Sequence, residues 1–462
     1  MKLLNFLRGE AFARGIHPPQ HKHTARTPIR RMPYPSQVTV PLLQHIGKPP
    51  QAIVRVGQEV VRGQPIARSD EWLSVPHHAP VTGVVQAIEL RPTARGPWTE
   101  SIVIRAHAAS TQEDQWGTPR DVQALSPQDI LQAVRDAGLV GLGGAAFPTH
   151  AKLTVPPQAQ VHTLVVNGCE CEPYLTCDHR VMLEEAPALL AGARLAMRAT
   201  GAMRTIIGVE DNKPDAVAAI QAAIDDSGAS DIFVEAVPTK YPQGSEKMLI
   251  MALFGVEIPS GALPVSLGMV MNNVGTLAAL GRLLPAGQGL TERVITVAGP
   301  GVARPGDYRV PLGTPMSHVL EWAGAPMART QACQLVLGGP MMGQAVASLD
   351  VPVTKGVSGV LVFRHEDMAD RDGRRSYPCI KCGACVESCP MGLNPATLGM
   401  LAARRQYDEM GARYHLGDCF ECGCCTWICP SNIPLVQQFR VAKQVLREQA
   451  VATPAVPVVV RH

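Results

Sequence analysis

Two cysteine motifs near the end of the chain constrain its structure more than any other feature. The stretches PCIKCGACVESCPMG (378–392) and DCFECGCCTWICPSN (418–432) each contain Cys-x2-Cys-x2-Cys-x3-Cys-Pro. In the two-cluster ferredoxin pattern, three cysteines of each motif hold one cubane and the fourth crosses to the other. The sequence therefore predicts two [4Fe–4S] clusters. The predicted ligands are Cys379, Cys382, Cys385 and Cys429 for one cluster, and Cys419, Cys422, Cys425 and Cys389 for the other.

Zinc is the alternative metal for cysteines at such spacings. Zinc favours four ligands in paired x2 knuckles, however, and not four plus four in this phase. Cys424 adjoins Cys425 and breaks the register, so we interpret it as a bystander or a weak alternative ligand. The spacer between the motifs (393–416) is predicted to be helical. Because two neighbouring clusters conduct single electrons, another site on the chain must supply them.

Length and composition limit the remaining possibilities. A chain of 462 residues, 46% of them hydrophobic, should form several domains. The formal charge of +3 does not favour nucleic acid or anionic lipid as a partner. We find no run of eighteen apolar residues and no signal peptide in residues 1–16, so we expect a soluble chain whose membrane attachment comes through partners. Nine of the 13 cysteines lie between Cys379 and Cys429, which indicates metal binding in a reducing, cytoplasmic compartment.

The first domain is predicted to be β-rich. After an N-terminal segment (1–25), residues 26–105 contain short strands punctuated by Pro and Gly, which are typical of a small sandwich or barrel. The pattern resembles the barrel-sandwich fold of biotinyl and lipoyl carriers, which present a modifiable lysine at a hairpin tip. This chain has no lysine between Val75 and Val84, so we predict a structural or docking role. We interpret His77 and His78 as exposed polar residues on the hairpin.

Residues 120–290 alternate between strand and helix patterns, which predicts a parallel, doubly wound α/β domain. The predicted strands and helices are, in order, a helix at 127–137, a strand at 161–167, a helix at 182–201, a strand at 204–210 and a strand at 231–237. A further helix is predicted after the second strand, capped by Asp211 or Asn212 and with Pro214 in its first turn.

The rest of the chain is predicted to form two smaller domains. Residues 291–363 return to short β segments with one helix near 316–323, so we predict a β-grasp-like module. Residues 372–450 form the helical two-cluster, ferredoxin-like domain, and 451–462 form a flexible tail. The predicted fold is therefore multidomain α/β.

A glycine-rich stretch at 136–153 (DAGLVGLGGAAFPTHAKL) is the first candidate for the site that supplies electrons to the clusters. Its glycines allow backbone N–H groups to approach a phosphate or a flavin ring. Gly141, Gly143 and Ala146 satisfy a loose G-x-G-x-x-A pattern, but a dinucleotide fingerprint should follow a strand, whereas a helix precedes this one. A simple glycine-rich turn is the alternative.

Three later loops favour a nucleotide or flavin pocket. The loop in 165–180 follows the first predicted strand, that in 240–250 follows the third, and 271–280 offers paired amides before a helix. Open α/β sheets bind ligands at the carboxyl ends of their strands. Three cysteines of the first loop match no common cluster spacing and are interpreted as small polar or packing residues: Cys169, Cys171 and Cys177.

The motifs G-L-x-G-x-G-G-A-x-F-P-T-x-x-K, N-x-x-E-x-E-P, Y-x-x-G-x-E and N-N-V-x-T resemble the FMN- and NADH-binding motifs of the flavoprotein subunit of respiratory complex I. Over nearly the whole chain, the domain order is similar to RnfC (RsxC in enteric bacteria), the NADH-oxidising subunit of the Rnf membrane complex. The resemblance implies that FMN contacts Gly141, Gly143, Gly144, Lys152, Asn167, Glu170, Tyr241, Gly244, Asn272, Asn273 and Thr276. It also implies that Phe147 stacks near the nicotinamide or adenine, with Glu172 and Glu246 nearby for NADH.

The resemblance implies a converter of two-electron into one-electron transfer. NADH would reduce the flavin, and single electrons would leave through the two cubanes toward partner subunits. No side-chain acid or base is needed, so no catalytic residue is predicted. The implied partners are the membrane-embedded and ferredoxin-like Rnf subunits, which couple the flow to ion translocation, and ferredoxin or flavodoxin through the complex. The implied location is peripheral, on the cytoplasmic face of the bacterial inner membrane.

Two other functions stay open at this point. A diaphorase subunit of a soluble hydrogenase or formate dehydrogenase shares the flavin motifs, but the carrier-like domain and the paired terminal motifs match it less well. A non-enzymatic electron-relay scaffold would keep the clusters and lose the flavin site. Three departures from the complex I motifs favour it: Leu142 replaces an arginine, Ala146 a common glycine and Cys169 a common aspartate.

Overall fold

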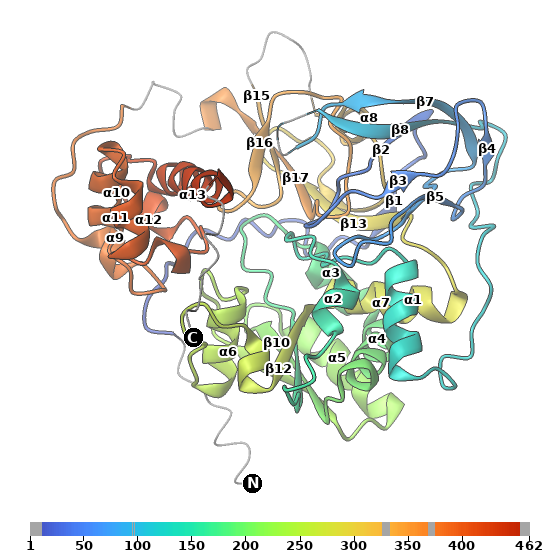
Figure 1. Cartoon of the computed structure of the whole chain (residues 1–462), viewed down its shortest axis with the longest axis horizontal. Helices are drawn as coiled ribbons and strands as arrows, with labels where there is room; N and C mark the ends of the chain where they lie inside the picture. Colours follow the sequence, from blue (N-terminus) through green and yellow to red (C-terminus); the bar gives the residue numbers. More distant parts are fainter. Residues whose placement is uncertain (1–11, 95, 97, 326–332, 368–374, 453–462) are drawn as a thin grey trace, which may run out of the picture.

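The computed structural model describes residues 12–94, 96, 98–325, 333–367 and 375–452. Most of the predicted N-terminal segment (1–11) and the end of the predicted tail (453–462) lie outside these residues. Figure 1 shows the α/β domain below two β-rich domains, with the helical cluster domain at one side. None of the helices in the described ranges is long and apolar enough to cross a membrane.

The N-terminal domain is a sandwich of two small sheets around one core. The first sheet has the order β2-β8-β7-β4 and the second the order β3-β5-β6. Alternating apolar residues such as Val38, Ile66 and Ile102 are buried between them. The strands are β2 (Gln37–Pro41), β3 (Gln51–Ala52), β4 (Glu59–Val60), β5 (Pro65–Arg68), β6 (His77–His78), β7 (Gly83–Arg91) and β8 (Thr99–Ala106).

The prediction that His77 and His78 are exposed is wrong. Their exposed fractions are 1% and 5%, and the His77 imidazole lies 2.8 Å from the Leu42 carbonyl. The hairpin is docked and not free, because the buried Lys355 ammonium donates to the carbonyls of both Pro76 (2.9 Å) and Gly138 (2.7 Å). Tertiary packing between three domains, which a local pattern does not report, therefore buries both imidazoles.

The α/β domain is built on a four-stranded parallel sheet of order β11-β10-β9-β12. Its three predicted strands are confirmed. The strands are β9 (Thr163–Asn167), β10 (Arg204–Glu210), β11 (Ile232–Val237) and β12 (Met269–Asn273). The helices are α1 (Pro127–Asp136), α2 (Thr149–Leu153), α3 (Cys177–Glu184), α4 (Ala186–Thr200), α5 (Pro214–Ser227), α6 (Glu246–Phe254) and α7 (Val274–Ala286), with a 3-10 turn, η1, at Pro264–Leu267.

Two local predictions for this domain are wrong. The single helix at 182–201 is divided between α3 and α4, because Pro187 in the first turn of α4 cannot continue the preceding helix. The N-cap position of α5 is occupied by Lys213, which makes no side-chain capping hydrogen bond, and not by Asp211 or Asn212. Asp211 instead accepts hydrogen bonds from Thr239, and the Asn212 amide donates to Gln20, so long-range partners occupy both side chains.

The third domain contains a six-stranded sheet of order β1-β14-β13-β17-β15-β16. Its helix, α8 (Met316–Trp322), matches the predicted one near 316–323. The edge strand β1 (Arg30–Arg31) comes from the N-terminal part of the chain and pairs in parallel with β14, which the sequence did not indicate. The other strands are β13 (Glu292–Ala298), β14 (Gly306–Pro311), β15 (Cys333–Leu337), β16 (Gln344–Val346) and β17 (Gly359–Arg364), followed by a 3-10 turn, η2, at His365–Asp367.

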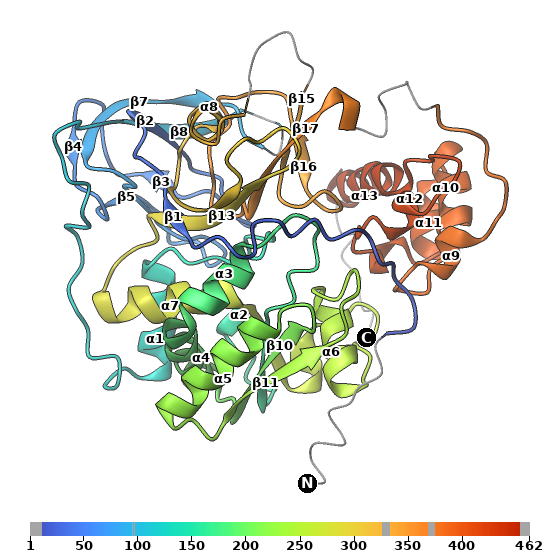
Figure 2. The same cartoon turned by 180° about the vertical axis from the view of Figure 1, so that it is seen from behind.

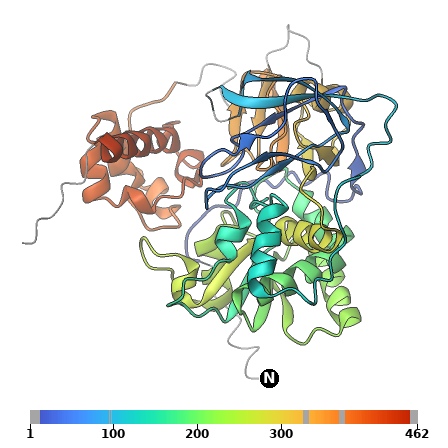
Figure 3. The same ribbon diagram turned by 45° about the vertical axis from the view of Figure 1, so that its right-hand side comes forward.

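The cluster domain is helical and stands beside the other domains (Figure 3). Leu398, Met410 and Phe439 are buried in its small core. The segment 12–29 runs along the back of the molecule, past α3, to reach this domain (Figure 2). Its helices are α9 (Ala384–Glu387), α10 (Pro395–Ala403), α11 (Tyr407–Ala412), α12 (Cys424–Trp427) and α13 (Leu435–Ala452), with a 3-10 turn, η3, at Leu416–Asp418.

Close packing of α4 on α7 provides a test of the α/β core. A Cβ added at Gly192 would lie 1.9 Å from the Leu277 carbonyl oxygen, so a side chain there must force the helices apart. We expect Gly192→Ala to destabilise the protein by about 1–3 kcal/mol. Gly411→Ala in α11 is the control, because its nearest neighbour is the Leu446 side chain at 3.4 Å. Thermal unfolding followed by circular dichroism should show a lower midpoint only for Gly192→Ala.

Candidate functional site

The predicted pocket loops meet at one edge of the parallel sheet. Asn167 and Asn273 end the neighbouring strands β9 and β12 and lie opposite each other in the register. The loop that follows β11 lies beside them, because the Asn167 amide donates to the Gly244 carbonyl at 2.8 Å. The Gly244 N–H in turn donates to the Cys171 sulfur at 3.2 Å. The topology thus brings together loops that are far apart in the sequence.

The glycine loop at 141–147 closes on itself above this edge. Its ends are joined by the hydrogen bond from the Gly141 N–H to the Phe147 carbonyl (2.8 Å), and the Leu142 N–H donates to the Thr276 hydroxyl of α7 (2.9 Å). The intervening residues 143–145 are exposed, and their N–H groups form no hydrogen bond within the described part of the chain. They can therefore donate to a ligand such as a phosphate or a flavin ring.

Three domains hold the glycine loop in place. Thr276 supports it from the α/β domain, and the Ile46 N–H of the N-terminal sandwich donates to the Ala146 carbonyl at 3.1 Å. From the third domain, the buried Arg293 guanidinium donates to the Leu142 carbonyl at 3.0 Å. The Ala146 backbone has a φ of 52°, an uncommon conformation for a residue with a side chain. Contacts from all sides maintain this conformation.

Acidic groups form the floor below the loop. The Glu170 carboxylate accepts hydrogen bonds from the N–H groups of Asp178 (2.8 Å) and His179 (3.1 Å), at the start of α3. The Asn273 amide donates to Asp178 at 2.6 Å. Burial, and then the neighbouring Glu170 carboxylate, raise the pKa of Asp178. The amide nitrogen of Asn272, the residue before Asn273 on β12, is buried without a hydrogen-bond partner among the described residues.

Several predicted site residues do not face this floor. Lys152 pairs with Glu246 at the side of the pocket. The Glu172 carboxylate accepts from the N–H groups of Met341 (3.0 Å) and Met342 (2.8 Å) in the third domain, and burial raises its pKa to about 7. Phe147 is half-buried in the glycine loop.

Tyr241 points from the pocket toward the cluster domain. Its ring is buried, and its hydroxyl donates to the Cys422 carbonyl at 2.6 Å. Tyr241 therefore joins the loop after β11 to one of the predicted cluster loops.

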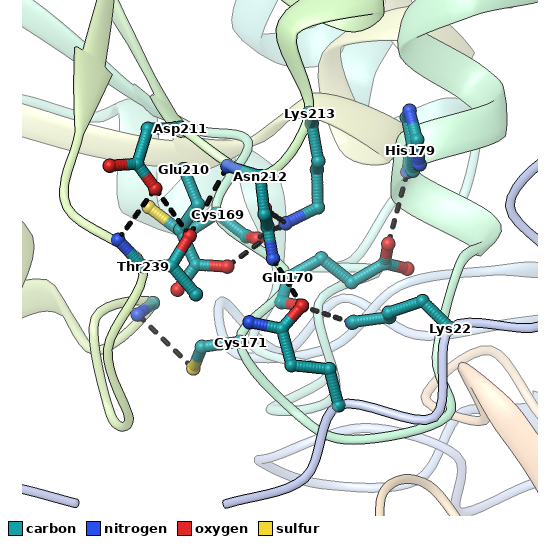
Figure 4. Close-up of polar contacts among 12 residues, drawn as sticks. Lys22, Cys169, Glu170, Cys171, His179, Glu210, Asp211, Asn212, Lys213 and Thr239 are labelled. Atoms are coloured by element: carbon teal, nitrogen blue, oxygen red, sulfur yellow. Dashed lines mark hydrogen bonds and ion pairs between the residues drawn. The ribbon is translucent and has the colours of Figure 1, made fainter. Parts of the chain in front are cut away.

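Sequence reasoning missed two lysines that hold the pocket loops, both labelled in Figure 4. Lys22 donates to three carbonyls of one loop, those of Glu170 (2.6 Å), Glu172 (2.8 Å) and Leu175 (2.6 Å). Lys213 donates to the Cys169 carbonyl at 2.6 Å and forms a buried ion pair with Glu210. Such lysines carry no local sequence signal, because their partners are backbone oxygens of other segments.

The two cysteine loops share the same backbone geometry. In each, the residue before the second cysteine and the glycine after it have positive φ: Lys381 (57°) and Gly383 (81°) in the first loop, Glu421 (63°) and Gly423 (87°) in the second. The third cysteine of each motif lies in the short helix that follows, α9 or α12. Curled backbone segments of this kind are typical of sites for iron–sulfur clusters and other anionic groups.

The cysteines of the two motifs form two groups in space. Burial raises the pKa of Cys385, and its thiol neighbours raise it further: Cys429, Cys379 and Cys382. Burial also raises the pKa of Cys425, whose thiol neighbours are, from the strongest to the weakest, Cys422, Cys419, Cys389 and Cys385. Cys429 of the second motif thus lies near Cys385, and Cys389 of the first motif lies near Cys425, as the crossed ligand pattern requires.

The arrangement is compatible with cubane ligation. Among the described residues, no three Cys, His, Asp or Glu side chains are arranged to hold one metal ion. Because each cysteine of a cubane binds a different iron atom, cluster ligands do not converge on one point. Cys424 is fully buried in a small core with Ile16 and Tyr241, against which the predicted ligand Cys422 also packs. The ligand sets themselves stay a prediction.

Comparison with known proteins agrees with this architecture. A subunit of the proton-translocating ferredoxin:NAD(+) oxidoreductase complex of Clostridium ljungdahlii is 39% identical over 410 residues, which cover 88% of each chain. The chain belongs to the RnfC family. The corresponding subunit of the Na(+)-translocating ferredoxin:NAD(+) oxidoreductase complex of Acetobacterium woodii is also 39% identical, over 86% of this chain and 88% of the relative.

Some members of the family are longer than this chain. The corresponding subunit of the ion-translocating oxidoreductase complex of Pectobacterium carotovorum is 40% identical over 94% of this chain but only 57% of its own length. A chain of a NAD+-reducing [NiFe]-hydrogenase has a TM-score of 0.47 and 25% identity over 64% of this chain and 55% of that chain, a score too low to support a functional comparison.

Four family models match successive parts of the chain. They are the RnfC barrel sandwich hybrid domain (10–109), the Nuo51 FMN-binding domain (134–282), the SLBB domain (294–345) and the 4Fe-4S dicluster domain (375–433). The predicted multidomain fold is confirmed in this order. The FMN-binding model spans the glycine loop and the three sheet-edge loops described above.

Neighbouring cysteines give a matched test of the ligand assignment. We expect Cys425→Ser to lose one of the two clusters, because it removes a predicted ligand. Cys424→Ser should retain both clusters, because Cys424 is packed in the domain junction. Iron content and the EPR spectrum of the dithionite-reduced protein measure both outcomes. Loss of a cluster in Cys424→Ser, with retention in Cys425→Ser, would contradict the assignment.

Proposed function

We propose that this chain oxidises NADH at a bound FMN and passes single electrons through two [4Fe–4S] clusters, as the RnfC subunit of an ion-translocating Rnf complex. The observation that carries this proposal is the direct contact between the pocket and a cluster loop, in which the Tyr241 hydroxyl donates to the Cys422 carbonyl. It joins the segment matched by the FMN-binding model to the segment matched by the dicluster model. A two-electron site and a one-electron relay therefore adjoin in one chain.

The chain supplies binding and orientation for the flavin. When bound, FMN accepts hydride from NADH and releases electrons one at a time. The free N–H groups at 143–145 would hold the phosphate or the ring edge, and Asn167, Asn272 and Asn273 would donate to the remaining polar atoms. Phe147 would cover the nicotinamide side. The half-buried floor at Asp178 would limit the access of water to the reacting atoms.

This proposal gives Glu172 and Glu246 structural roles in place of direct NADH binding. Both were predicted to bind NADH, yet Glu172 accepts from backbone N–H groups of the third domain and Glu246 pairs with Lys152. We propose that Glu246 and Lys152 line the pocket entrance as a pair, and that Glu172 orients the loop that carries Glu170.

The predicted cluster at Cys379 and Cys382 would pass electrons to partner subunits. Cys379 and Cys382 are exposed, and so are their neighbours Tyr377 (60%) and Ile380 (67%). By contrast, Cys389 and Cys425 of the other group are buried. We propose that the exposed loop faces a ferredoxin-like or membrane-embedded subunit, with the chain bound peripherally at the cytoplasmic face of the membrane. Its relatives are named as ferredoxin:NAD(+) oxidoreductase subunits, so ferredoxin is the proposed far partner.

Thr276 provides a test of the flavin pocket. In Thr276→Val the buried Leu142 N–H loses its acceptor, which costs about 1–3 kcal/mol and releases the glycine loop. We expect FMN affinity to fall by about tenfold or more, since about 1.4 kcal/mol corresponds to that factor. Thr276→Ser keeps the hydroxyl and should bind FMN normally. Flavin fluorescence titration of both proteins decides between this role and simple loss of packing, which would weaken both variants alike.

The activity itself is tested with purified, cluster-reconstituted protein under anaerobic conditions. With FMN bound, NADH should bleach the flavin absorbance within seconds and then produce the EPR signals of reduced clusters; the experiment is repeated with NADPH to establish which nucleotide is used. Intact clusters in a protein that binds no flavin, or a flavin that NADH does not reduce, would instead support the electron-relay scaffold.

A further inference from the structure

An extended segment, residues 12–29, links the pocket to the cluster domain, and we call it the strap. The described residues of the strap form no helix or strand, apart from one isolated β-bridge between Ile16 and Tyr241. Figure 2 shows the strap crossing from the sheet edge near α3 to the cluster domain. Its contacts fall into three groups along the path.

Near its start, at residues 14 and 15, the strap contacts the cluster domain between the two predicted clusters. The Gly15 N–H donates to the Ser388 carbonyl at 3.2 Å, and the Arg14 guanidinium donates to the Val386 carbonyl at 3.2 Å. Ser388 and Val386 lie between the predicted ligands Cys385 and Cys389, which belong to different clusters. The strap thus forms hydrogen bonds with the turn that connects the two cluster sites.

In its middle, the strap pairs with Tyr241, the residue that joins the pocket to a cluster loop. Ile16 and Tyr241 exchange two backbone hydrogen bonds, each of 2.9 Å. The Ile16 side chain is buried with the Tyr241 ring and Cys424. Because the Tyr241 hydroxyl also donates to the Cys422 carbonyl, one crossing connects the strap, the pocket loop and the second cysteine loop.

Beyond the crossing, the strap is anchored to the pocket. Its Lys22 ammonium uses all three of its N–H groups on the carbonyls of Glu170, Glu172 and Leu175. The Tyr174 N–H donates back to the Gln20 carbonyl at 2.8 Å. Ionic hydrogen bonds of this kind are among the stronger ones in proteins, so this end is firmly held.

We propose that the strap sets the separation between the flavin pocket and the Cys419–Cys422–Cys425 cluster, with Ile16 as the positioning residue at the crossing. This inference rests on the proposed function. Another contact between the two domains, the Ser260 hydroxyl with Asp418, is exposed and contributes less to rigidity. Electron transfer depends steeply on separation, so a displaced strap slows the step from flavin to cluster without changing hydride transfer to the flavin.

The test separates the two half-reactions in anaerobic stopped-flow measurements on the full chain with FMN and both clusters. Ile16→Ser removes the apolar contact at the crossing. Ile29→Ser is the matched control, because it makes the same change in the same strap where the side chain packs against the α/β core. NADH is mixed with each protein, flavin bleaching is followed by absorbance, and cluster reduction by rapid-freeze EPR. Ile16→Val serves as the conservative rescue.

We expect Ile16→Ser to bleach its flavin at the wild-type rate and to reduce its clusters about tenfold more slowly, since small misplacements of reacting groups can cost that much. Ile29→Ser and Ile16→Val should match the wild type in both steps. An unchanged cluster rate in Ile16→Ser, or an equal loss in Ile29→Ser, overturns the inference. Wild-type protein that NADH does not reduce at all refutes the proposed function instead.

If Ile16→Ser loses iron, its rate of cluster reduction cannot be compared with that of the wild type, and a second variant is used. Gly15→Ala adds a Cβ that would lie 2.5 Å from the Tyr241 carbonyl oxygen, so it displaces the same crossing without introducing a polar group. We expect the same selective slowing of cluster reduction. A wild-type cluster rate in Gly15→Ala overturns the inference.

Discussion

Buried cations that donate to backbone carbonyls hold the site together. The pocket is made of irregular loops, whose carbonyls are not satisfied by helices or sheets and therefore need donors from elsewhere. Lys22 supplies three of them, Lys213 supplies the one at Cys169, and Arg293 supplies the one at Leu142. Lys355 bonds the carbonyls of Pro76 and Gly138 behind the glycine loop, and burial lowers its pKa to about 7. Three of these cations, Lys22, Arg293 and Lys355, come from outside the α/β domain, so the pocket depends on the strap and the third domain being in place.

Much of this architecture could be predicted from local patterns, because local chemistry determines it. The cysteine spacing indicated two clusters, and the apolar runs at β9, β10 and β11 indicated a parallel sheet whose carboxyl ends form the site. What the sequence could not indicate is which groups are neighbours across domains. Partners more than twenty residues away determine three features that local patterns missed. They are the burial of His77 and His78, the N-cap position of Lys213, and the hydrogen bonds that Glu172 accepts from the third domain.

Two of the three departures from the complex I motifs, at Leu142 and Cys169, share a physical explanation. The Leu142 side chain packs in the core of the α/β domain, while its backbone holds the loop, with the N–H bound to Thr276 and the carbonyl to Arg293. Cys169 is buried, and its carbonyl accepts from Lys213. The two positions therefore serve as backbone contacts for cations supplied by other segments. Both positions lie in the segment that the FMN-binding model spans.

The path of the N-terminal part of the chain has a consequence for the order of folding. Residues 12–31 leave the ribosome long before their partners are made, since β1 pairs with β14 and Gly15 bonds Ser388. Contacts between such distant positions close slowly, and the domains between them can fold as units first. The contacts of this segment with β14 and Ser388 can therefore form only late in synthesis, whereas its contacts with residues 170–175 and 241 can form earlier. Its attachment to Ser388 then marks the completed assembly of pocket and cluster domain in a newly made chain.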